Sequence, residues 1–436
     1  MADSATSSDP AVQRQLARIA ALGPGADVLG LDRITRLLSR LGDPQLRLPP
    51  VLHVAGTNGK GSTCAVLRAA IEGAGLTAHV YASPHLVRFN ERIRVAGTLI
   101  DDAMLAASLA EVLDVGEDVG ASFFEVTTAA AFLCFACVPA DACIVEVGLG
   151  GRLDATNVLP APAVCGIAQL GVDHEAFLGS DPVGIAGEKA GIAKRGKPLV
   201  TLAYAPEVAE RIAEVAADAG APVLAEGRDW SIDAHGGYAD AQVGLTLARP
   251  ALAGAHQWHN AGLAIAMLRH QRAFSLTDAA LAAAPAAARW PARLQRLGAG
   301  PLTRALPPGS EVWLDGGHNP AAAQAIAAWI ASTADPRPLH IVVGMLANKD
   351  ARGLLAPLLP AAASLTALPV PGHEHHAPDT LAVLARAAGL SARTAEDVAR
   401  ALDTLADEAG APVRVLILGS LYLAGEVLAL NDEAPD

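Results

Sequence analysis

Residues 51–62 read Val51-Leu52-His53-Val54-Ala55-Gly56-Thr57-Asn58-Gly59-Lys60-Gly61-Ser62. The apolar run 51–55 is typical of a short buried strand, and a helical pattern begins at Ser62. The glycine-rich turn between them predicts a phosphate-binding loop, because glycines let backbone N–H groups close around phosphate oxygens and a helix N-terminus adds positive potential. Lys60 would add charge and Ser62 could face Mg²⁺, although the intervening Gly61 departs from the usual G-x-x-x-x-G-K-[ST] spacing. A plain glycine-rich turn is the alternative, and the position between a strand and a helix disfavours it.

The rest of the first half alternates between strand and helix patterns. The apolar run 126–137 predicts a long helix, and further strands are predicted at 77–81, 142–147, 164–167 and 198–201. Such alternation predicts an α/β fold with a mainly parallel sheet covered by helices.

A second α/β unit is predicted from about residue 298 onwards. Asn319 and Pro320 are typical of a helix N-cap followed by the first helical position. Strands are predicted at 312–314, 340–343, 364–368 and 413–418. We therefore expect a P-loop domain over 1–293 and a smaller, doubly wound Rossmann-like domain over 298–436, with the Pro/Ala-rich stretch 284–291 leading to a hinge.

Composition narrows the class of protein. The chain has 436 residues, of which 52% are hydrophobic, and this favours two globular domains. The net charge of −13 argues against a general nucleic-acid binder, because phosphate backbones need Lys/Arg surfaces, but not against small anionic substrates. No run is long enough to span a membrane, and residues 1–10 do not resemble a signal peptide. We expect a cytoplasmic monomer without a membrane partner.

Several titratable residues have two interpretations. Cys134 and Cys137 form C-x-x-C inside an apolar run, which predicts buried core thiols. The segment 373–376, His-Glu-His-His, could bind a metal, but a solvated loop is expected. Glu146 ends a predicted strand, where P-loop enzymes place a carboxylate on Mg²⁺, or it is simply an acid at a strand end. Lys189 lies in an apolar, helix-like stretch, where a lysine usually extends to solvent.

Several motifs together resemble the folylpolyglutamate synthase/dihydrofolate synthase family of the Mur ligase superfamily. The resemblance runs from about Leu29 to Val427, in the family's order, through the segments 29–33, 55–62, 83–92, 146–157, 173–174, 188–192, 315–320 and 419–423. The residues before the loop are too few for the nucleotide-sugar domain of the peptidoglycan-building Mur ligases.

The resemblance implies an ATP-dependent ligase that joins a pterin or folate carboxylate to L-glutamate through an acyl phosphate. The implied substrates are dihydropteroate, folates, L-glutamate and ATP, with two Mg²⁺ ions as cofactors. A bifunctional dihydrofolate and folylpolyglutamate synthase is the favoured interpretation. Alternatives are a folylpolyglutamate synthase alone, another Mur-type ligase, or a P-loop NTPase that uses ATP for conformational switching. The motif at 315–320 and the second α/β domain disfavour the last.

The resemblance also implies the site residues. The catalytic groups would be Lys60, Lys189 (which family members often carry as a carbamate) and His318. ATP would be bound by Thr57, Asn58, Gly59, Lys60, Gly61, Ser62, Asn260, Arg293 and Asp315. The metal ions would be held by Ser62, Ser83, Glu146 and His174, although spacing alone makes His174 a core or loop histidine. The pterin or folate would be bound by Gly30, Leu31, Asp32, Ser122, Phe123, Phe124, Glu125, Asp154 and Ala155. L-Glutamate would be bound by His318 and Ser420.

Two of these residues, and one position next to Arg293, have a further interpretation. Phe123 and Phe124 can stack on a flat heterocycle, but a phenylalanine pair taken alone favours core packing. The family usually has glycine at the position of Ala292, so the alanine puts a positive φ there in doubt.

Overall fold

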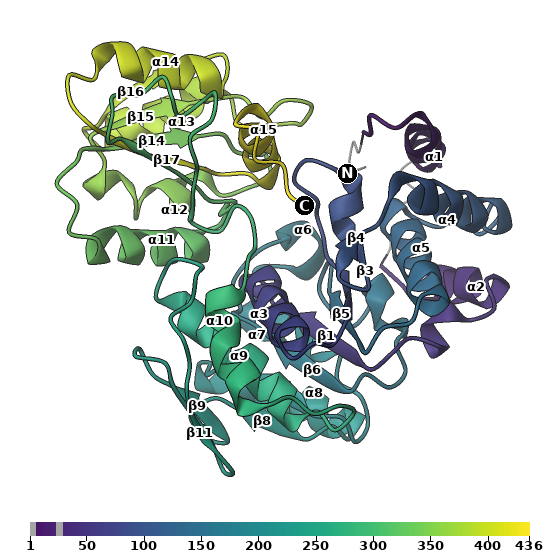
Figure 1. Ribbon diagram of the computed structural model, residues 1–436. Coiled ribbons are helices and arrows are strands. Elements are labelled where there is room, and N and C mark those ends of the chain that lie inside the picture. The colour runs from purple at the N-terminus through teal and green to yellow at the C-terminus, as the bar shows by residue number, and fades with distance from the viewer. Residues whose placement is uncertain (1–5, 23–28) are drawn as a thin grey trace. The chain divides into compact units, whose positions relative to one another are not determined.

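Strand β1 (Val51–Ala55) lies in the interior of an eight-stranded sheet with the order β4-β3-β2-β5-β1-β6-β7-β8. The computed structural model describes residues 6–22 and 29–436, which form two compact units. Unit 1 contains 6–22, 29–251, 257–289 and Asp436, and unit 2 contains 252–256 and 290–435. Each unit is an α/β structure (Figure 1), as the sequence predicts.

The sheet of unit 1 is parallel except at one edge. Strand β3 pairs antiparallel with β2 and with β4, and all other neighbouring strands are parallel. The other strands are β2 (Ala78–Tyr81), β3 (Ile93–Val95), β4 (Thr98–Leu99), β5 (Ala142–Glu146), β6 (Val164–Ile167), β7 (Leu199–Thr201) and β8 (Val223–Ala225). The predicted central strands are therefore confirmed to within one residue at each end.

Helices connect these strands. The α-helices are α1 (Pro10–Ala21), α2 (Asp32–Arg40), α3 (Lys60–Gly73), α4 (Asp102–Val115), α5 (Phe123–Cys137), α6 (Glu175–Leu178), α7 (Pro182–Ala190), α8 (Pro206–Ala219), α9 (His256–His270) and α10 (Asp278–Ala287). Short 3₁₀ helices are η1 (Pro44–Leu46), η2 (Phe89–Arg92) and η3 (Ala155–Val158). Helix α3 begins at Lys60, two residues before the predicted start, because Gly59 at φ +82° turns the chain directly from the loop into the helix.

Unit 1 also contains a three-stranded antiparallel sheet that the sequence patterns did not reveal. Its strands are β9 (Trp230–Ile232), β10 (Gly237–Asp240) and β11 (Gly244–Thr246). These strands are only three or four residues long, too short for a clear alternation of apolar and polar side chains.

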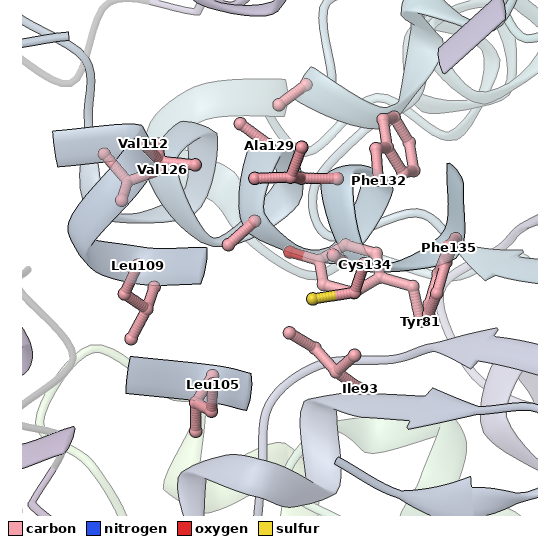
Figure 2. Close-up of a cluster of buried hydrophobic side chains, with 14 of the residues drawn as sticks. Tyr81, Ile93, Leu105, Leu109, Val112, Val126, Ala129, Phe132, Cys134 and Phe135 are labelled. Atoms are coloured by element: carbon pink, nitrogen blue, oxygen red, sulfur yellow. The ribbon is translucent and has the colours of Figure 1, made fainter. Parts of the chain in front are cut away.

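Helices α4 and α5 share the main apolar core of unit 1 (Figure 2). Leu105, Leu109 and Val112 of α4 belong to the same buried cluster as Val126 and Phe132 of α5. The thiols at the end of α5 correct one expectation. Cys134 is buried as predicted, but Cys137 is exposed, because it is the last residue of α5 and none of residues 136–140 is fully buried.

Unit 2 has a six-stranded sheet with the order β12-β13-β17-β14-β15-β16, and only β12 runs antiparallel. Its strands are β12 (Gln295–Arg296), β13 (Glu311–Leu314), β14 (Leu339–Val343), β15 (Ser364–Ala367), β16 (Ser391–Thr394) and β17 (Arg414–Leu418). Its helices are α11 (Pro320–Ser332), α12 (Ala351–Leu355), η4 (Leu359–Ala361), α13 (Pro378–Ala387), α14 (Val398–Glu408) and α15 (Leu421–Leu430). This confirms the predicted Rossmann-like sheet.

Local signals in unit 2 had mixed outcomes. Asn319 caps α11 by accepting a hydrogen bond from Ala322 N at 2.9 Å, and Pro320 is the first helical residue, as predicted. The stretch 284–291, which was expected to lead to a hinge, begins inside α10, because residues 284–287 complete this helix with Pro285 inside it. Within the part of the chain that the structure describes, no helix is long and apolar enough to cross a membrane.

Candidate functional site

The phosphate-loop candidate connects β1 to α3 and is fixed by the segment after β6. The backbone N–H groups of Thr57 and Asn58 both donate to Gln169 O, at 2.9 and 3.1 Å. Thr57 Oγ1 donates to Gly171 O at 2.8 Å. A side chain at Gly59 is excluded, because a Cβ would lie 2.3 Å from Asn260 Oδ1 of α9. The structure therefore brings the predicted loop and Asn260 together.

Lys60 and Glu146 meet at the carboxyl ends of adjacent parallel strands. Glu146 is the last residue of β5 and is 5% exposed. Lys60 Nζ lies 4.0 Å from Glu146 Oε1 and donates to Thr57 O at 3.2 Å. Ser62, the third residue of α3, is buried. A lysine, a carboxylate and a hydroxyl at this position are the groups that P-loop enzymes commonly use to bind a nucleoside triphosphate with Mg²⁺.

Lys189 lies on α7 and points into the protein, contrary to the expectation that it would reach solvent. Its side chain is 4% exposed, and Nζ donates to Gly56 O at 3.0 Å. Burial, helped by the positive charge of Lys60, lowers the pKa of Lys189 to about 7. The neutral amine is therefore populated much more at neutral pH than it is in an ordinary lysine.

The remaining predicted metal ligands lie in loops. Ser83 follows β2 and is half-buried. His174 is exposed, adopts φ +54° and is the N-cap residue of the short helix α6, so of the two positions that its spacing allowed, core or loop, it occupies the loop. Within residues 6–22 and 29–436, no three His, Cys, Asp or Glu side chains cluster in a way that could hold a metal ion.

The predicted pterin-binding residues converge on the start of α5. Glu125 Oε2 accepts hydrogen bonds from Ser122 N at 2.7 Å and from Arg33 Nε of α2 at 3.0 Å. The bond to Arg33 joins the segment Gly30, Leu31 and Asp32 to Ser122 and Glu125. Arg33 was not among the predicted site residues, although it stands next to Asp32 within the motif at 29–33.

Phe124 packs against the loop that follows β5. A Cβ at Gly148 would lie 2.4 Å from Phe124 Cζ, and the ring centroid of Tyr81 is 6.0 Å from that of Phe124. Phe123 makes an edge contact with Phe89 at 6.0 Å. Both Phe123 and Phe124 are half-buried, so each packs on the core and still presents part of its ring.

Replacing Gly148 with alanine is expected to raise the KM for a pterin acid about tenfold while leaving the KM for ATP nearly unchanged. The new methyl group would displace the Phe124 ring, and overpacking of this kind costs about 1–3 kcal/mol. Steady-state kinetics with each substrate varied in turn would measure the effect. Gly73→Ala is the matched control, because nothing lies within 4 Å of a Cβ there. An equal rise in both KM values would contradict this role for Phe124.

Asp154 is buried and holds its own loop in place. Its carboxylate accepts hydrogen bonds from Leu149 N at 2.8 Å, Thr156 N at 3.0 Å and Thr156 Oγ1 at 2.5 Å. Burial raises the pKa of Asp154, and these hydrogen bonds oppose the shift. The neighbouring Ala155 is also buried. The Asp154 carboxylate is therefore a fixed hydrogen-bond acceptor between Glu146 at the end of β5 and helix η3.

In unit 2, Asp315 ties together two loops that carry predicted nucleotide contacts. Its carboxylate accepts hydrogen bonds from Leu294 N at 2.8 Å and Gly317 N at 2.6 Å. Ala292 O accepts a hydrogen bond from Gly316 N at 2.9 Å, which places Arg293 beside the same loop. Ala292 does adopt a positive φ, +54°, so the alanine keeps the left-handed backbone that its side chain had put in doubt. Packing decides this backbone angle, since Ala292 is fully buried and hydrogen-bonded through both its N–H and its C=O.

His318 and Ser420 lie at the carboxyl ends of β13 and β17, which are adjacent in the sheet. His318 Nδ1 donates to Gly316 O at 2.8 Å, and Ser420 caps α15 by accepting from Tyr422 N at 3.1 Å. Gly419 N donates to Gly317 O at 3.0 Å, so the two loops are joined. In open α/β sheets, ligands bind at this edge.

The histidine loop at 373–376 is half-buried and held by backbone groups. His375 Nδ1 donates to His373 O and His376 Nε2 donates to Lys349 O, both at 2.8 Å. The ring of His373 stacks on Tyr422 with centroids 3.7 Å apart. These contacts agree with a structural loop more than with a freely solvated one.

His259, next to Asn260 on α9, is paired with Glu226 at 2.8 Å. The hydrogen bond to Glu226 raises the pKa of His259 above its usual value near 6.5, against the effect of burial. Because the folded state binds this proton more tightly, the stabilisation is complete below about pH 6.5 and is lost as pH rises through the folded pKa.

Replacing His259 with glutamine is therefore expected to lower the free energy of unfolding by about 0.2–1 kcal/mol at about pH 5, and by much less at about pH 8.5. Urea titrations at both pH values would measure this. His235→Gln, on the exposed turn before β10, is the control for the loss of one histidine. A destabilisation that does not change with pH would contradict the charged pair.

Comparisons with known proteins agree over nearly the whole chain. Residues 302–421 match the family described as "Mur ligase, glutamate ligase domain". The chain is 34% identical to the dihydrofolate synthase/folylpolyglutamate synthase of Escherichia coli K12, over 93% of this chain and 92% of the relative. A structure of E. coli FolC in complex with DHPP and ADP superimposes with a TM-score of 0.87 and 32% identity, covering 98% of this chain and 99% of that one. The bifunctional Yersinia pestis enzyme complexed with AMPPNP and Mn ion gives a TM-score of 0.85 and 32% identity, covering 97% and 98%.

Proposed function

The chain belongs to the folylpolyglutamate synthase/dihydrofolate synthase family, and on this premise we propose that it is an ATP-dependent ligase for L-glutamate with two acceptors. It would join dihydropteroate to L-glutamate and would also extend the γ-glutamyl tail of folates. The observation that carries the proposal is the meeting of Lys60, Glu146 and Lys189 at one phosphate loop, with the half-buried Phe124 beside the same strand end.

ATP and a divalent metal would bind at the loop of unit 1. Ser62, Ser83 and Glu146 offer oxygen ligands, which suit Mg²⁺, whereas His174 offers a nitrogen. Phosphate oxygens of ATP and water molecules would complete the coordination of two Mg²⁺ ions. The metal would neutralise charge on the transferred phosphoryl group. The backbone of 57–62 and Asn260 would position ATP within unit 1.

The chemistry proceeds in two steps. The carboxylate of the acceptor attacks the γ-phosphorus of ATP, which forms an acyl phosphate and releases ADP. The neutral amine of L-glutamate then attacks the acyl carbon, the amide forms, and inorganic phosphate leaves with the loss of one amine proton. Lys60 would stabilise negative charge during the first step. His318 and Ser420 would orient L-glutamate in the second step, and unit 2 would be the glutamate domain.

Lys189 is proposed to act as a carbamate. A neutral amine adds CO₂ and releases one proton, and burial provides the neutral amine at near-neutral pH. We expect a carbamate signal in ¹³C NMR after incubation with ¹³C-labelled bicarbonate, and its absence from a Lys189→Arg variant. Activity should fall by about tenfold or more when bicarbonate is removed. The signal should strengthen as pH rises through about 7, because the neutral form of the amine then dominates. A Lys189→Arg spectrum identical to the wild type would contradict the assignment.

The proposed function is tested by phosphate release from ATP in the presence of L-glutamate. Dihydropteroate and tetrahydrofolate are compared as acceptors. Turnover with both acceptors is the expected result. Turnover with tetrahydrofolate alone would mean that the protein acts only as a folylpolyglutamate synthase. ATP hydrolysis that does not depend on L-glutamate would favour a switching NTPase. Mass spectrometry of the product separates ligation from hydrolysis, and size-exclusion chromatography tests the expected monomer.

A further inference from the structure

Three buried polar side chains connect strand β1 to the predicted pterin site. His53 lies in the middle of β1, Thr156 lies in η3, and Asp154 caps η3. His53 Nε2 is 2.8 Å from Thr156 Oγ1, which is 2.5 Å from Asp154 Oδ1. His53 and Thr156 are 0% exposed and Asp154 is 3% exposed. A polar ring inside an apolar strand costs free energy unless it forms hydrogen bonds, so a histidine here requires a reason.

The direction of each hydrogen bond follows from the available protons. The Asp154 carboxylate can only accept, so Thr156 must donate its single hydroxyl proton to it. His53 Nε2 must then carry the ring proton and donate it to Thr156 Oγ1. Burial, with a smaller effect of Lys194, lowers the pKa of His53 to about 3, which keeps the ring neutral. The other nitrogen, Nδ1, has no hydrogen-bond partner among the described residues.

The hydrogen bonds from Thr156 and Leu149 fix the orientation of the Asp154 carboxylate. Oδ1 receives Thr156 N at 3.0 Å as well as the Thr156 hydroxyl, and Oδ2 receives Leu149 N at 2.8 Å. The two backbone donors would remain after a change at Thr156, but the hydroxyl would not. Because His53 Nε2 donates its proton to Thr156 Oγ1, the Thr156 hydroxyl proton remains available for Asp154.

We propose that His53 and Thr156 are positioning residues that orient the Asp154 carboxylate for the N–H groups of the pterin acid. This inference rests on the proposed function and on the role in pterin binding that the family resemblance implies for Asp154. His53 also lies in the strand that leads into the phosphate loop at Gly56. A single strand would thus position both the ATP loop and the acceptor site.

The test is a comparison of matched variants in the full-length enzyme. Thr156→Val removes the hydroxyl at nearly constant shape, and Thr156→Ser keeps it. We expect Thr156→Val to raise the KM for dihydropteroate about tenfold or more, with the KM for ATP changed less than about twofold. Thr156→Ser should stay within about threefold of the wild type. His53→Gln keeps a nitrogen donor at the Nε2 position, whereas the shorter side chain of His53→Asn does not reach it. We therefore expect a lower KM for dihydropteroate with His53→Gln than with His53→Asn.

Two further measurements make the outcomes distinct. Asp154→Asn tests the proposed function itself: an unchanged KM for dihydropteroate would remove Asp154 from the pterin site. If Asp154→Asn raises this KM and Thr156→Val does not, the positioning role alone is overturned. An equal change in both KM values would also overturn it, because that indicates general damage to the fold. ¹⁵N NMR should show His53 protonated on Nε2. Protonation on Nδ1 would mean that His53 does not donate to Thr156, and it would overturn the positioning role.

Discussion

Replacing Lys60 with methionine is expected to lower kcat/KM for ligation about a thousandfold. Lys60 Nζ is directed at the phosphate loop by its bond to Thr57 O at 3.2 Å, and the neighbouring Lys189 has its pKa lowered to about 7. Methionine keeps a long unbranched side chain that favours helix, so the start of α3 should persist while the charge is lost. Most of the loss should appear in kcat, because charge develops on the transferred phosphoryl group during reaction.

The same variant has a second expected effect. The positive charge of Lys60 is one cause of the lowered pKa of Lys189, so Lys60→Met should raise that pKa and reduce the neutral amine at pH 7. A pH titration of the carbamate signal would detect the shift. Lys197→Met is the control for removal of one lysine from unit 1. Retention of more than about a tenth of the activity by Lys60→Met would mean that this loop does not carry the phosphoryl transfer.

Replacing Glu146 with glutamine is expected to lower kcat about a hundredfold and to raise the Mg²⁺ concentration needed for half-maximal activity. Glu146 is 5% exposed at the end of β5 and faces Lys60 at 4.0 Å. A neutral amide keeps the shape but binds a divalent cation poorly. It also leaves Lys60 without its nearby carboxylate.

Titration of Mg²⁺ at saturating ATP separates these effects. The matched control is Glu188→Gln, which removes the same charge from a side chain that pairs with the exposed Arg152 at 2.8 Å. The control should behave as the wild type in its Mg²⁺ dependence. If Glu146→Gln loses activity with an unchanged Mg²⁺ dependence, Glu146 supports the loop but does not bind the metal.

The sequence predicted the elements whose signals are local. The apolar run 51–55 followed by glycines gave β1 and its loop, and Asn319 with Pro320 gave the start of α11. Where a local signal was weak, the prediction failed: the short strands β9, β10 and β11 carry little periodicity. The exposure of Cys137 depends on where α5 leaves the core, which an apolar run does not mark.

By itself, then, the sequence determined the α/β class, the phosphate loop, the second Rossmann-like unit and the family resemblance. Only the tertiary structure decided that Lys189 lies on Gly56 O across 133 residues, and that Arg33 reaches Glu125 across 92. It also decided that His53 meets Thr156 and that Ala292 takes φ +54°. The physical reason is that strand order, with β1 between β5 and β6, sets which loops meet, and this order depends on contacts between distant segments. Periodicity and glycine spacing are properties of a few neighbouring residues, so they do not indicate which distant segments are in contact.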